Sequence, residues 1–283
     1  MSRSSDLLLT AVAPVIWGTT FIAITEFLPK DYPLTLAMLR ALPAGLLLML
    51  FVRRLPWGGW WWRCLVLGAL NFSLFWGLMF FAAYRLPGGV AATLGNFQPP
   101  MVIILAYLLL GTPIRLLSVV AVLAGIVGVA LLVLAPSTSL DPLGLAAGFM
   151  SAASMAAGLV LTRRWMPPVS QITFAAWQLT AGGLLLLPFA LLLEPALPPL
   201  TWRNVAGITW LSMFGAALTY IIWFRGVARL EAAVVSSLGF LSPLTAVLLG
   251  WMLLGESLTA IQITGAVMVL GSIWLNQRAQ APR

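Results

Sequence analysis

The sequence predicts an all-α integral membrane protein with ten transmembrane helices, arranged as two inverted five-helix repeats. Three observations lead to this prediction: a composition unsuited to a soluble surface, ten apolar runs of spanning length, and a segment that recurs in the second half. Of the 283 residues, 61% are hydrophobic and 8% are charged, and the mean hydropathy is +1.04. Because soluble domains carry about 25% charged residues, this chain is expected in a bilayer.

Composition also excludes several chemistries. Histidine is absent and cysteine occurs once, as Cys64, so the chain offers neither a disulfide framework nor a Cys/His metal site. We therefore expect no metal and no other cofactor. The net charge is +8, but the basic residues are scattered between apolar runs and form no basic helix, so nucleic acid is not an expected partner. The lipid bilayer is the expected environment.

The apolar runs have the length of about 20 residues that crosses a bilayer as a helix. Short connections rich in proline, glycine and charge separate them. The first run contains Ala11-Val12-Ala13, which resembles a signal cleavage site, but Pro14 follows directly, so we expect an uncleaved helix. The expected spans are 7–27, 33–52, 63–83, 87–110, 116–135, 143–163, 171–193, 204–224, 231–254 and 258–275.

The distribution of Lys and Arg predicts the orientation. Ten spans place both termini on one side, and that side carries Arg3, Arg53, Arg54, Arg63, Arg115, Arg163, Arg164, Arg225, Arg229, Arg278 and Arg283. The opposite side carries only Lys30, Arg85 and Arg203, and Arg40 lies inside a span. The positive-inside rule therefore predicts cytoplasmic termini.

The second half repeats part of the first. Residues 85–111 align without gaps with residues 229–255, sharing Arg-Leu, Leu-Gly, Pro and Leu-Leu-Gly at the same offset of 144. The offset aligns the fourth span with the ninth, so each half, 1–137 and 138–283, has five spans. Five is odd, so the second half is inverted. Inverted repeats are typical of secondary transporters; duplication for packing alone is the alternative.

These residues resemble a known family. The stretch PVIWGTTF at 14–21, Leu39-Arg40-Ala41, the paired Pro99 and Pro243, and Leu254-Gly255-Glu256 resemble the ten-helix drug/metabolite transporter superfamily with two EamA-type repeats. The chain is most similar to its bacterial amino-acid and metabolite exporters, including the aromatic amino-acid type. The resemblance implies a central cavity lined by spans one, three, four, six, eight and nine. The first half departs from the pattern, with Thr112 at the position equivalent to Glu256.

The two prolines mark candidate hinges. Pro99 and Pro243 stand at equivalent depths near the middle of spans four and nine. Each removes an amide hydrogen bond and frees the carbonyl four residues back, at Gly95 and Gly239. Free carbonyls in a membrane must face protein or a watery cavity. They could bind a substrate ammonium or serve as bending points; a kink satisfied by neighbouring helices is the alternative.

Polar and aromatic side chains near these positions are the candidate substrate contacts. Small polar groups could hold a zwitterion, although they also link helices by hydrogen bonds. Aromatic rings could form a wall for a flat substrate, although core packing would use them too. The candidates are Trp17, Thr20, Phe21, Trp76, Phe80, Asn96, Gln98, Tyr220, Phe224, Ser237 and Ser242.

Arg40 is the clear charge inside a span. At the centre of a helix an arginine costs about 2.5–3.5 kcal/mol on insertion scales. It could anchor a substrate carboxylate, or it could pair with Glu26 or Asp31 near the outer end of its span. Both interpretations stay open at this point.

The predicted function is export of neutral amino acids, including aromatic ones, or of similar small metabolites across a bacterial inner membrane. A lipophilic-cation exporter would need a buried carboxylate, and a sugar-phosphate antiporter several central basic residues. A membrane enzyme would lack the usual acid, base and metal groups, so we expect no enzyme; a membrane scaffold is a further alternative. The partner is a small-molecule substrate, and a monomer is compatible with the sequence. All acidic residues fall at span ends or in loops, which predicts facilitated transport without proton coupling.

Overall fold

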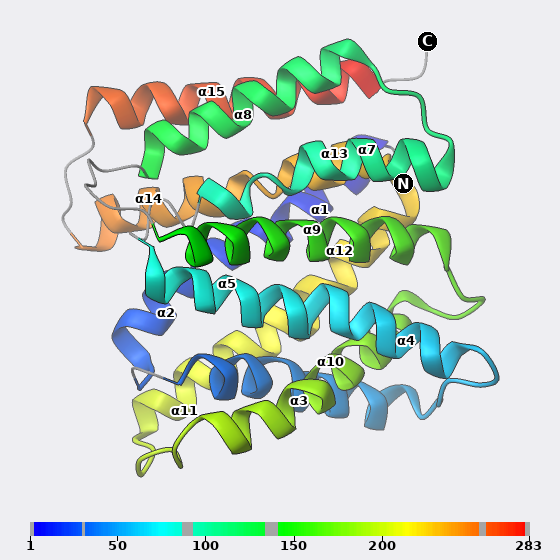
Figure 1. Cartoon of the computed structure of the whole chain (residues 1–283), viewed down its shortest axis with the longest axis vertical. Helices are drawn as coiled ribbons and strands as arrows, with labels where there is room; N and C mark the ends of the chain where they lie inside the picture. Colours follow the sequence, from blue (N-terminus) through cyan, green and yellow to red (C-terminus); the bar gives the residue numbers. More distant parts are fainter. Residues whose placement is uncertain (1–2, 30–31, 87–92, 134–140, 255–258, 281–283) are drawn as a thin grey trace.

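The computed structural model describes residues 3–29, 32–86, 93–133, 141–254 and 259–280. Within these ranges the chain is helical and contains no strand. Figure 1 shows long helices packed side by side, with their axes running mostly across the view. The first and last described segments meet, because the Arg3 guanidinium donates a hydrogen bond to the Gln280 carbonyl at 3.3 Å.

The first half contains seven described helices and one π-helical segment. These are α1 (Arg3–Gly18), α2 (Thr20–Phe27), α3 (Pro33–Val52), α4 (Trp60–Gly68), η1 (Ala69–Ser73), α5 (Leu74–Arg85), α7 (Gln98–Leu110) and α8 (Leu116–Val133). The second half contains α9 (Pro142–Arg164), α10 (Gln171–Leu193), α11 (Trp202–Thr209), the π-helical η2 (Trp210–Leu218), α12 (Thr219–Arg229), α13 (Ala232–Leu238), α14 (Leu241–Leu254) and α15 (Ala260–Gln280).

Local sequence signals fix several helix ends. The Asp141 side chain accepts from the amides of Leu143 and Gly144 at the start of α9, and Ser170 accepts from Thr173 at the start of α10. Such caps satisfy amides that a helix leaves without partners. Glycine ends α7, because Gly111 adopts the left-handed conformation with φ of 67°.

Nine stretches of the described chain are long and apolar enough to cross a membrane, which makes this a multi-pass membrane protein. They correspond to the first nine expected spans: Arg3–Ile24, Pro33–Val52, Trp60–Ala82, Thr93–Leu110, Leu116–Val133, Pro142–Arg164, Gln171–Leu193, Trp202–Arg229 and Ala232–Leu253. The expected tenth span is α15, a helix of 21 residues. Its last two turns carry Asn276, Gln277, Arg278 and Gln280, and these lower its apolarity. A tenth crossing stays a prediction.

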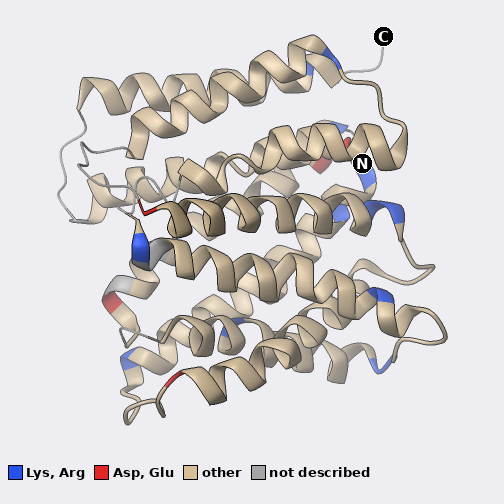
Figure 2. Ribbon diagram, viewed as in Figure 1, with Lys and Arg blue, Asp and Glu red and all other residues tan. Residues whose placement is uncertain are grey.

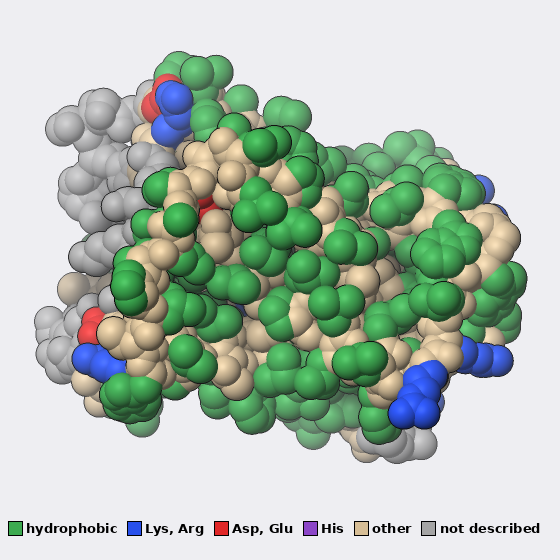
Figure 3. All heavy atoms as spheres, turned by 90° about the horizontal axis from the view of Figure 1, so that it is seen from below, with side chains coloured by type: hydrophobic (Ala, Val, Ile, Leu, Met, Phe, Trp, Pro, Cys, Tyr) green, Lys and Arg blue, Asp and Glu red, His purple; other side chains and the backbone are tan. Residues whose placement is uncertain are grey.

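The outer surface fits a lipid environment. Charged residues gather near the ends of the helices (Figure 2). The face seen in Figure 3 is covered by hydrophobic side chains, with Lys and Arg at its edges. Large apolar residues point outward along these helices, among them Leu50 at 75%, Leu192 at 81% and Val267 at 65% exposure. A soluble protein would expose far smaller apolar patches.

Spans four and nine are broken at equivalent places. A turn at Asn96–Phe97 separates helical residues 93–95 from α7, and a turn at Gly239–Phe240 separates α13 from α14. Both turns precede the buried Pro99 and Pro243. The Gly239 carbonyl, expected to be free, accepts from the Ser242 amide at 3.0 Å. That expectation was wrong for Gly239, because a tighter i→i+3 bond replaces the one that proline removes.

Helices related by the sequence offset of 144 make equivalent contacts. The helix α5 packs on α9, and its equivalent α12 packs on α1. Likewise η1 packs on α10 as η2 packs on α3, and α7 packs on α9 as α14 packs on α1. The pairs α3–α10 and α8–α15 join equivalent helices of the two halves. The contact pattern of the first half therefore recurs in the second.

Glycine allows the closest of these contacts, and one pair of residues tests this. A Cβ at Gly265 would lie 2.6 Å from the Gly128 carbonyl oxygen, whereas one at Gly271, on the same helix α15, would meet nothing within 4 Å. We expect Gly265→Ala to destabilise the protein by about 1–3 kcal/mol, as overpacking does, and Gly271→Ala to leave it as stable or slightly more stable. Thermal unfolding in detergent measures both. Equal melting temperatures for the two variants would contradict the packing argument.

Candidate functional site

An aromatic cluster lies where α1, the third span and the eighth span meet. It consists of Trp17, Phe72, Trp76, Tyr220 and Trp223. The Phe72 ring lies 4.6 Å from Tyr220 and 5.3 Å from Trp76, and Trp17 lies 5.2 Å from Tyr220 and 4.9 Å from Trp223, measured between ring centroids. All but Trp17 are buried, at 2% exposure or less. These centroid distances fall in the range favoured by aromatic pairs, and the rings meet tilted or edge-on, so the cluster is a closely packed group of rings.

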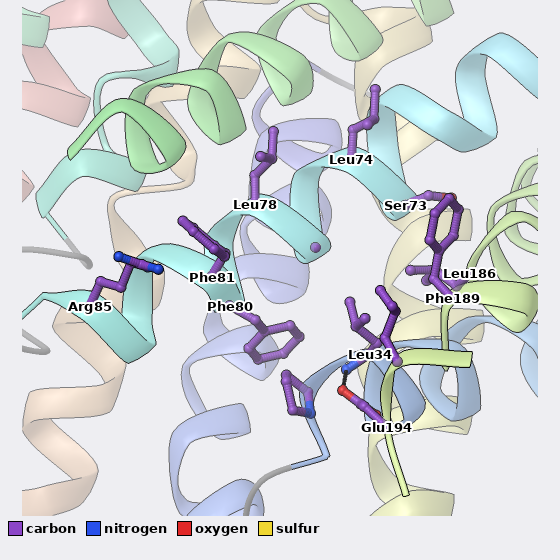
Figure 4. Close-up of a pocket in the computed structure, with 13 residues that line it drawn as sticks. Leu34, Ser73, Leu74, Leu78, Phe80, Phe81, Arg85, Leu186, Phe189 and Glu194 are labelled. Atoms are coloured by element: carbon purple, nitrogen blue, oxygen red, sulfur yellow. Dashed lines mark hydrogen bonds between the residues drawn. The ribbon is translucent and has the colours of Figure 1, made fainter. Parts of the chain in front are cut away.

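The structure places one member of the predicted aromatic pairs away from the other three. Trp76 and Tyr220 belong to the cluster, and Phe224 packs beside Tyr220 at 5.6 Å. Phe80, one turn beyond Trp76, faces elsewhere. It lines an apolar hollow of about 630 Å³ between α3, α5 and α10, near Leu34 and Glu194 (Figure 4). The offset therefore related residue positions correctly, but did not distinguish the faces of α5.

Two π-helical segments flank the cluster at equivalent positions. The segment η1 lies in the third span and η2 in the eighth, and Asn71 of η1 aligns with Gly215 of η2 at the offset of 144. A π-helix shifts the register of backbone hydrogen bonds and is frequent at functional sites. Sequence patterns did not predict either segment.

The Gly215 carbonyl is a shared acceptor. The Arg40 guanidinium donates to it at 2.8 Å and the Trp17 indole N–H at 3.2 Å. The same indole N–H lies 3.0 Å from the Thr219 hydroxyl. One backbone oxygen thus connects α1, α3 and η2.

Arg40 is buried, at 9% exposure. Its guanidinium carbon lies 4.8 Å from the centre of the Trp76 ring, a cation–π geometry. Its Nε is buried without a hydrogen-bond partner. Among the residues that the structure describes, no carboxylate pairs with Arg40: the expected Glu26 is exposed and forms no ion pair with it. The other expected partner, Asp31, lies outside the described residues.

The equivalent position in the first half holds a neutral network. The Asn71 amide donates to the Gln178 side-chain oxygen at 2.8 Å and to the Thr162 hydroxyl at 3.1 Å. All three side chains are buried. Sequence analysis missed this network, although polar Asn71 in a span, aligned with Gly215, was a usable signal.

The remaining predicted residues lie around the helix breaks. Ser237 is buried and donates to the Val234 carbonyl of its own helix at 2.8 Å. Thr20 Oγ1 and Gln98 Nε2 are buried without partners. Ser242 lies against α1, because a Cβ at Gly18 would come within 2.7 Å of its carbonyl oxygen. Asn96 lies in the span-four break, and Gly95 is the last helical residue before it. The Phe21 side chain and Glu256 lie outside what the structure describes.

Ion pairs lie at both ends of the helices. At the end that carries the first described residues, Asp6 accepts from Arg225 at 2.5 Å and from Arg229 at 3.4 Å, and Arg3 pairs with Glu231 at 2.8 Å. At the opposite end, Arg85 pairs with Asp141 at 3.1 Å. The Arg85 hydrogen bond, and more weakly the Gly144 and Leu143 amides, lower the pKa of the Asp141 carboxyl below its ordinary value. Arg85 and Arg229 are equivalent at the offset of 144.

These features define a multi-helix membrane protein with a polar, aromatic-walled centre, and sequence comparison assigns the family. The profile of the EamA-like transporter family matches residues 4–134 and again 142–277. The chain belongs to the EamA-like transporter family, which is part of the drug/metabolite transporter superfamily.

Individual relatives agree with this assignment. The chain is 46% identical over 267 residues to Protein PecM of Dickeya dadantii, covering 94% of this chain and 90% of that protein. It is 28% identical to a probable amino-acid metabolite efflux pump of Salmonella typhimurium, covering 98% and 95%. An inner membrane transporter of Escherichia coli, YedA, is 28% identical over 88% and 82%. One solved crystal structure has the same fold, with a TM-score of 0.85 at 19% identity over 99% and 98% of the two chains.

Trp17 offers a test of the aromatic wall. We expect Trp17→Ala to lower transport of aromatic substrates roughly tenfold relative to small ones, because it removes about 1.4 kcal/mol of ring contact. Trp274→Ala is the matched control, since Trp274 is 56% exposed on α15. Uptake per unit of folded protein is the measurement. An equal loss for every substrate, proportional to protein level, would make Trp17 a packing residue only.

Proposed function

We propose that this transporter exports neutral amino acids, including aromatic ones, or similar small metabolites from the cytoplasm across a bacterial inner membrane. The observation that carries the proposal is the aromatic cluster around Arg40, which combines apolar rings with one fixed charge at the meeting point of the two halves. Transporter sites lie at such repeat interfaces near the midplane. The Salmonella relative, a probable amino-acid metabolite efflux pump, supports the same substrate class.

The proposed architecture is ten crossings in two inverted units, 1–137 and 138–283. Support comes from the two family matches and from helix contacts that recur at the offset of 144. The hydrogen bond from Arg3 to the Gln280 carbonyl also supports it, because chain ends on one side require an even number of crossings. The helix α15 is then the tenth crossing, with its apolar face toward lipid.

Alternating access is the proposed mechanism. The breaks before Pro99 and Pro243 give spans four and nine flexible points at equivalent depths, and proline leaves such points with fewer helical bonds. The ion pairs Asp6–Arg229 and Arg85–Asp141 involve equivalent arginines at opposite ends. In this mechanism each pair closes one end, and the two ends open in turn.

Transport is proposed to need no ion gradient. The described acidic residues lie away from the aromatic cluster: Asp6, Glu194 and Glu231 hold partners at helix ends, Asp141 caps α9, and Glu26 is exposed. Arginine keeps its proton at all relevant pH values. No described group at the centre can therefore exchange a proton with the substrate near neutral pH.

A lipophilic-cation exporter is the second candidate, since aromatic rings bind cations. The buried Arg40 argues against it, because a fixed positive charge at the cluster repels a cationic substrate.

Purified protein in liposomes tests transport and coupling. We expect net flux of a radiolabelled substrate down its own gradient, with no ion gradient and little response to an imposed pH gradient between pH 5 and 8. The lowered pKa of Asp141 keeps the Arg85–Asp141 pair ionised over this range. Protein-free liposomes are the control. Uphill accumulation that follows a proton gradient, and disappears in Glu26→Gln, would refute uncoupled transport.

Fusion proteins test the orientation. A fluorescent protein at the C-terminus should fold and fluoresce in the cytoplasm, and a phosphatase inserted beside Asp141 should be active in the periplasm. This expectation follows from the bias of eleven basic residues against three. A dark C-terminal fusion together with an active C-terminal phosphatase would reverse the orientation.

A further inference from the structure

The charge at the aromatic cluster has no described counter-charge. Arg40 is nine-tenths buried, and its described polar contact is one backbone oxygen, that of Gly215. Cation–π contact with Trp76 offsets part of the desolvation but supplies no negative charge. A buried charge without a partner is costly, and an ionisable residue inside a membrane marks a functional site by default. The missing partner is therefore expected to come from the transported molecule.

The backbone beside the guanidinium is not tightly packed. A Cβ at Gly215 would come no closer than 3.7 Å to any neighbouring atom, and Arg40 Nη2 and the Trp210 carbonyl oxygen both lie at that distance. Packing glycines such as Gly18 and Gly226 would instead bring a Cβ to 2.5 and 2.4 Å. Gly215 is thus not required for close helix contact, and a methyl group would fit next to the charge in van der Waals contact. Arg40 Nε is also buried and unpartnered, so a donor is available there.

Among the described residues, the same region offers an ammonium group aromatic faces but few free hydrogen-bond acceptors. The Gly215 carbonyl already accepts two hydrogen bonds, and the Gly239 carbonyl accepts from Ser242. Ser236 and Ser237 donate into their own helix. No described carboxylate reaches the cluster. A zwitterion would find a partner for its carboxylate and none of opposite charge for its ammonium.

We propose that the preferred substrate is an organic anion: a planar aromatic ring bearing a carboxylate, without a compensating ammonium. The carboxylate pairs with Arg40, whose planar fork matches two oxygens, and the ring packs among Trp17, Trp76 and Tyr220. This inference rests on the proposed export function, and among the small metabolites proposed there it selects those with a net negative charge over the neutral amino acids. These rings pack against one another in the structure, so they must separate for a substrate ring to enter between them.

An anionic substrate makes uncoupled export electrogenic. One negative charge leaving a cell whose interior is negative moves down the electrical potential. A potential of 100 mV corresponds to about 50-fold accumulation at equilibrium for a single charge. A neutral zwitterion gains nothing from the same potential. Membrane potential therefore separates the two substrate classes.

The experiment uses proteoliposomes with potassium gradients and valinomycin to set the potential, and three probes that share one ring. L-3-phenyllactate replaces the ammonium of L-phenylalanine by a hydroxyl, and phenethylamine lacks the carboxylate. We expect phenyllactate to be transported fastest and to accumulate up to about 50-fold toward the positive side at 100 mV. Phenylalanine should be slower and insensitive to potential, and phenethylamine slowest.

Substitutions test whether Arg40 and the space beside it determine the preference for phenyllactate. Arg40→Gln should lose the preference for phenyllactate at least tenfold while keeping or raising the melting temperature, because it removes an unpaired buried charge. Gly215→Ala should fold normally and also weaken phenyllactate transport by filling the adjacent space. Arg203→Gln is the matched control, since exposed Arg203 also stacks on a ring, at 5.4 Å from Phe27. Asp31→Asn should behave like wild type.

The outcomes are distinguishable. Flux of phenylalanine that equals or exceeds phenyllactate, with no response to potential, overturns the anion inference and leaves the export proposal intact. An Arg40→Gln loss reproduced by Asp31→Asn overturns it as well, because Asp31 would then be the counter-ion. Absence of flux for all three probes defeats the export proposal itself, and fastest flux of phenethylamine defeats both in favour of cation export.

Discussion

The Gly215 carbonyl is the point on which the centre of this transporter depends. Lipid offers no hydrogen bonds, so a polar group at that depth is costly unless it finds a partner. The π-helical η2 presents this oxygen to Arg40 of α3 and Trp17 of α1 together. Those two residues in turn contact the rings of Trp76 and Tyr220. One backbone group is thus linked to the aromatic cluster through two side chains.

The two π-helical segments are connected to their neighbouring helices by different chemical groups. At equivalent places in the third and eighth spans, a π-helical segment must be joined to a neighbouring long helix. Around η1 of the first half, the neutral amide of Asn71 donates to Gln178 of α10, while Asn71 Oδ1 and Gln178 Nε2 have no hydrogen-bond partner. Around η2 of the second half, the Gly215 carbonyl accepts from the charged Arg40 of α3, whose Nε has no partner. The two equivalent places are therefore chemically asymmetric, with a neutral amide pair at one and a charged group at the other.

Much of the fold was predictable because lipid enforces simple patterns. Run lengths predicted ten spans, of which the first nine match described stretches long and apolar enough to cross a membrane. The offset of 144 related the helix breaks and the pair Trp76 and Tyr220. The π-helical segments were not predictable, because their hydrogen-bond register depends on tertiary partners such as Arg40 and Gln178. The position of Phe80 was missed since an offset relates positions but not helix faces. The Gly239 carbonyl was misjudged because removing one helical bond allowed a shorter one from Ser242.

The ion pairs at the two ends of the helices differ in solvent exposure, and this difference affects the proposed transport cycle. At the terminal end Asp6 is 11% exposed and contacts two arginines, with Arg3–Glu231 alongside. At the opposite end Arg85 and Asp141 are 43% and 29% exposed, so solvent weakens their attraction. Separating a desolvated pair costs more than separating a hydrated one. If both ends open in turn around one central site, the terminal end must therefore be the harder one to open. Substrate binding at that end has to supply the additional free energy of separating the buried ion pair. The pairing of a substrate carboxylate with Arg40 is one such source, because it neutralises a charge that has no described counter-charge.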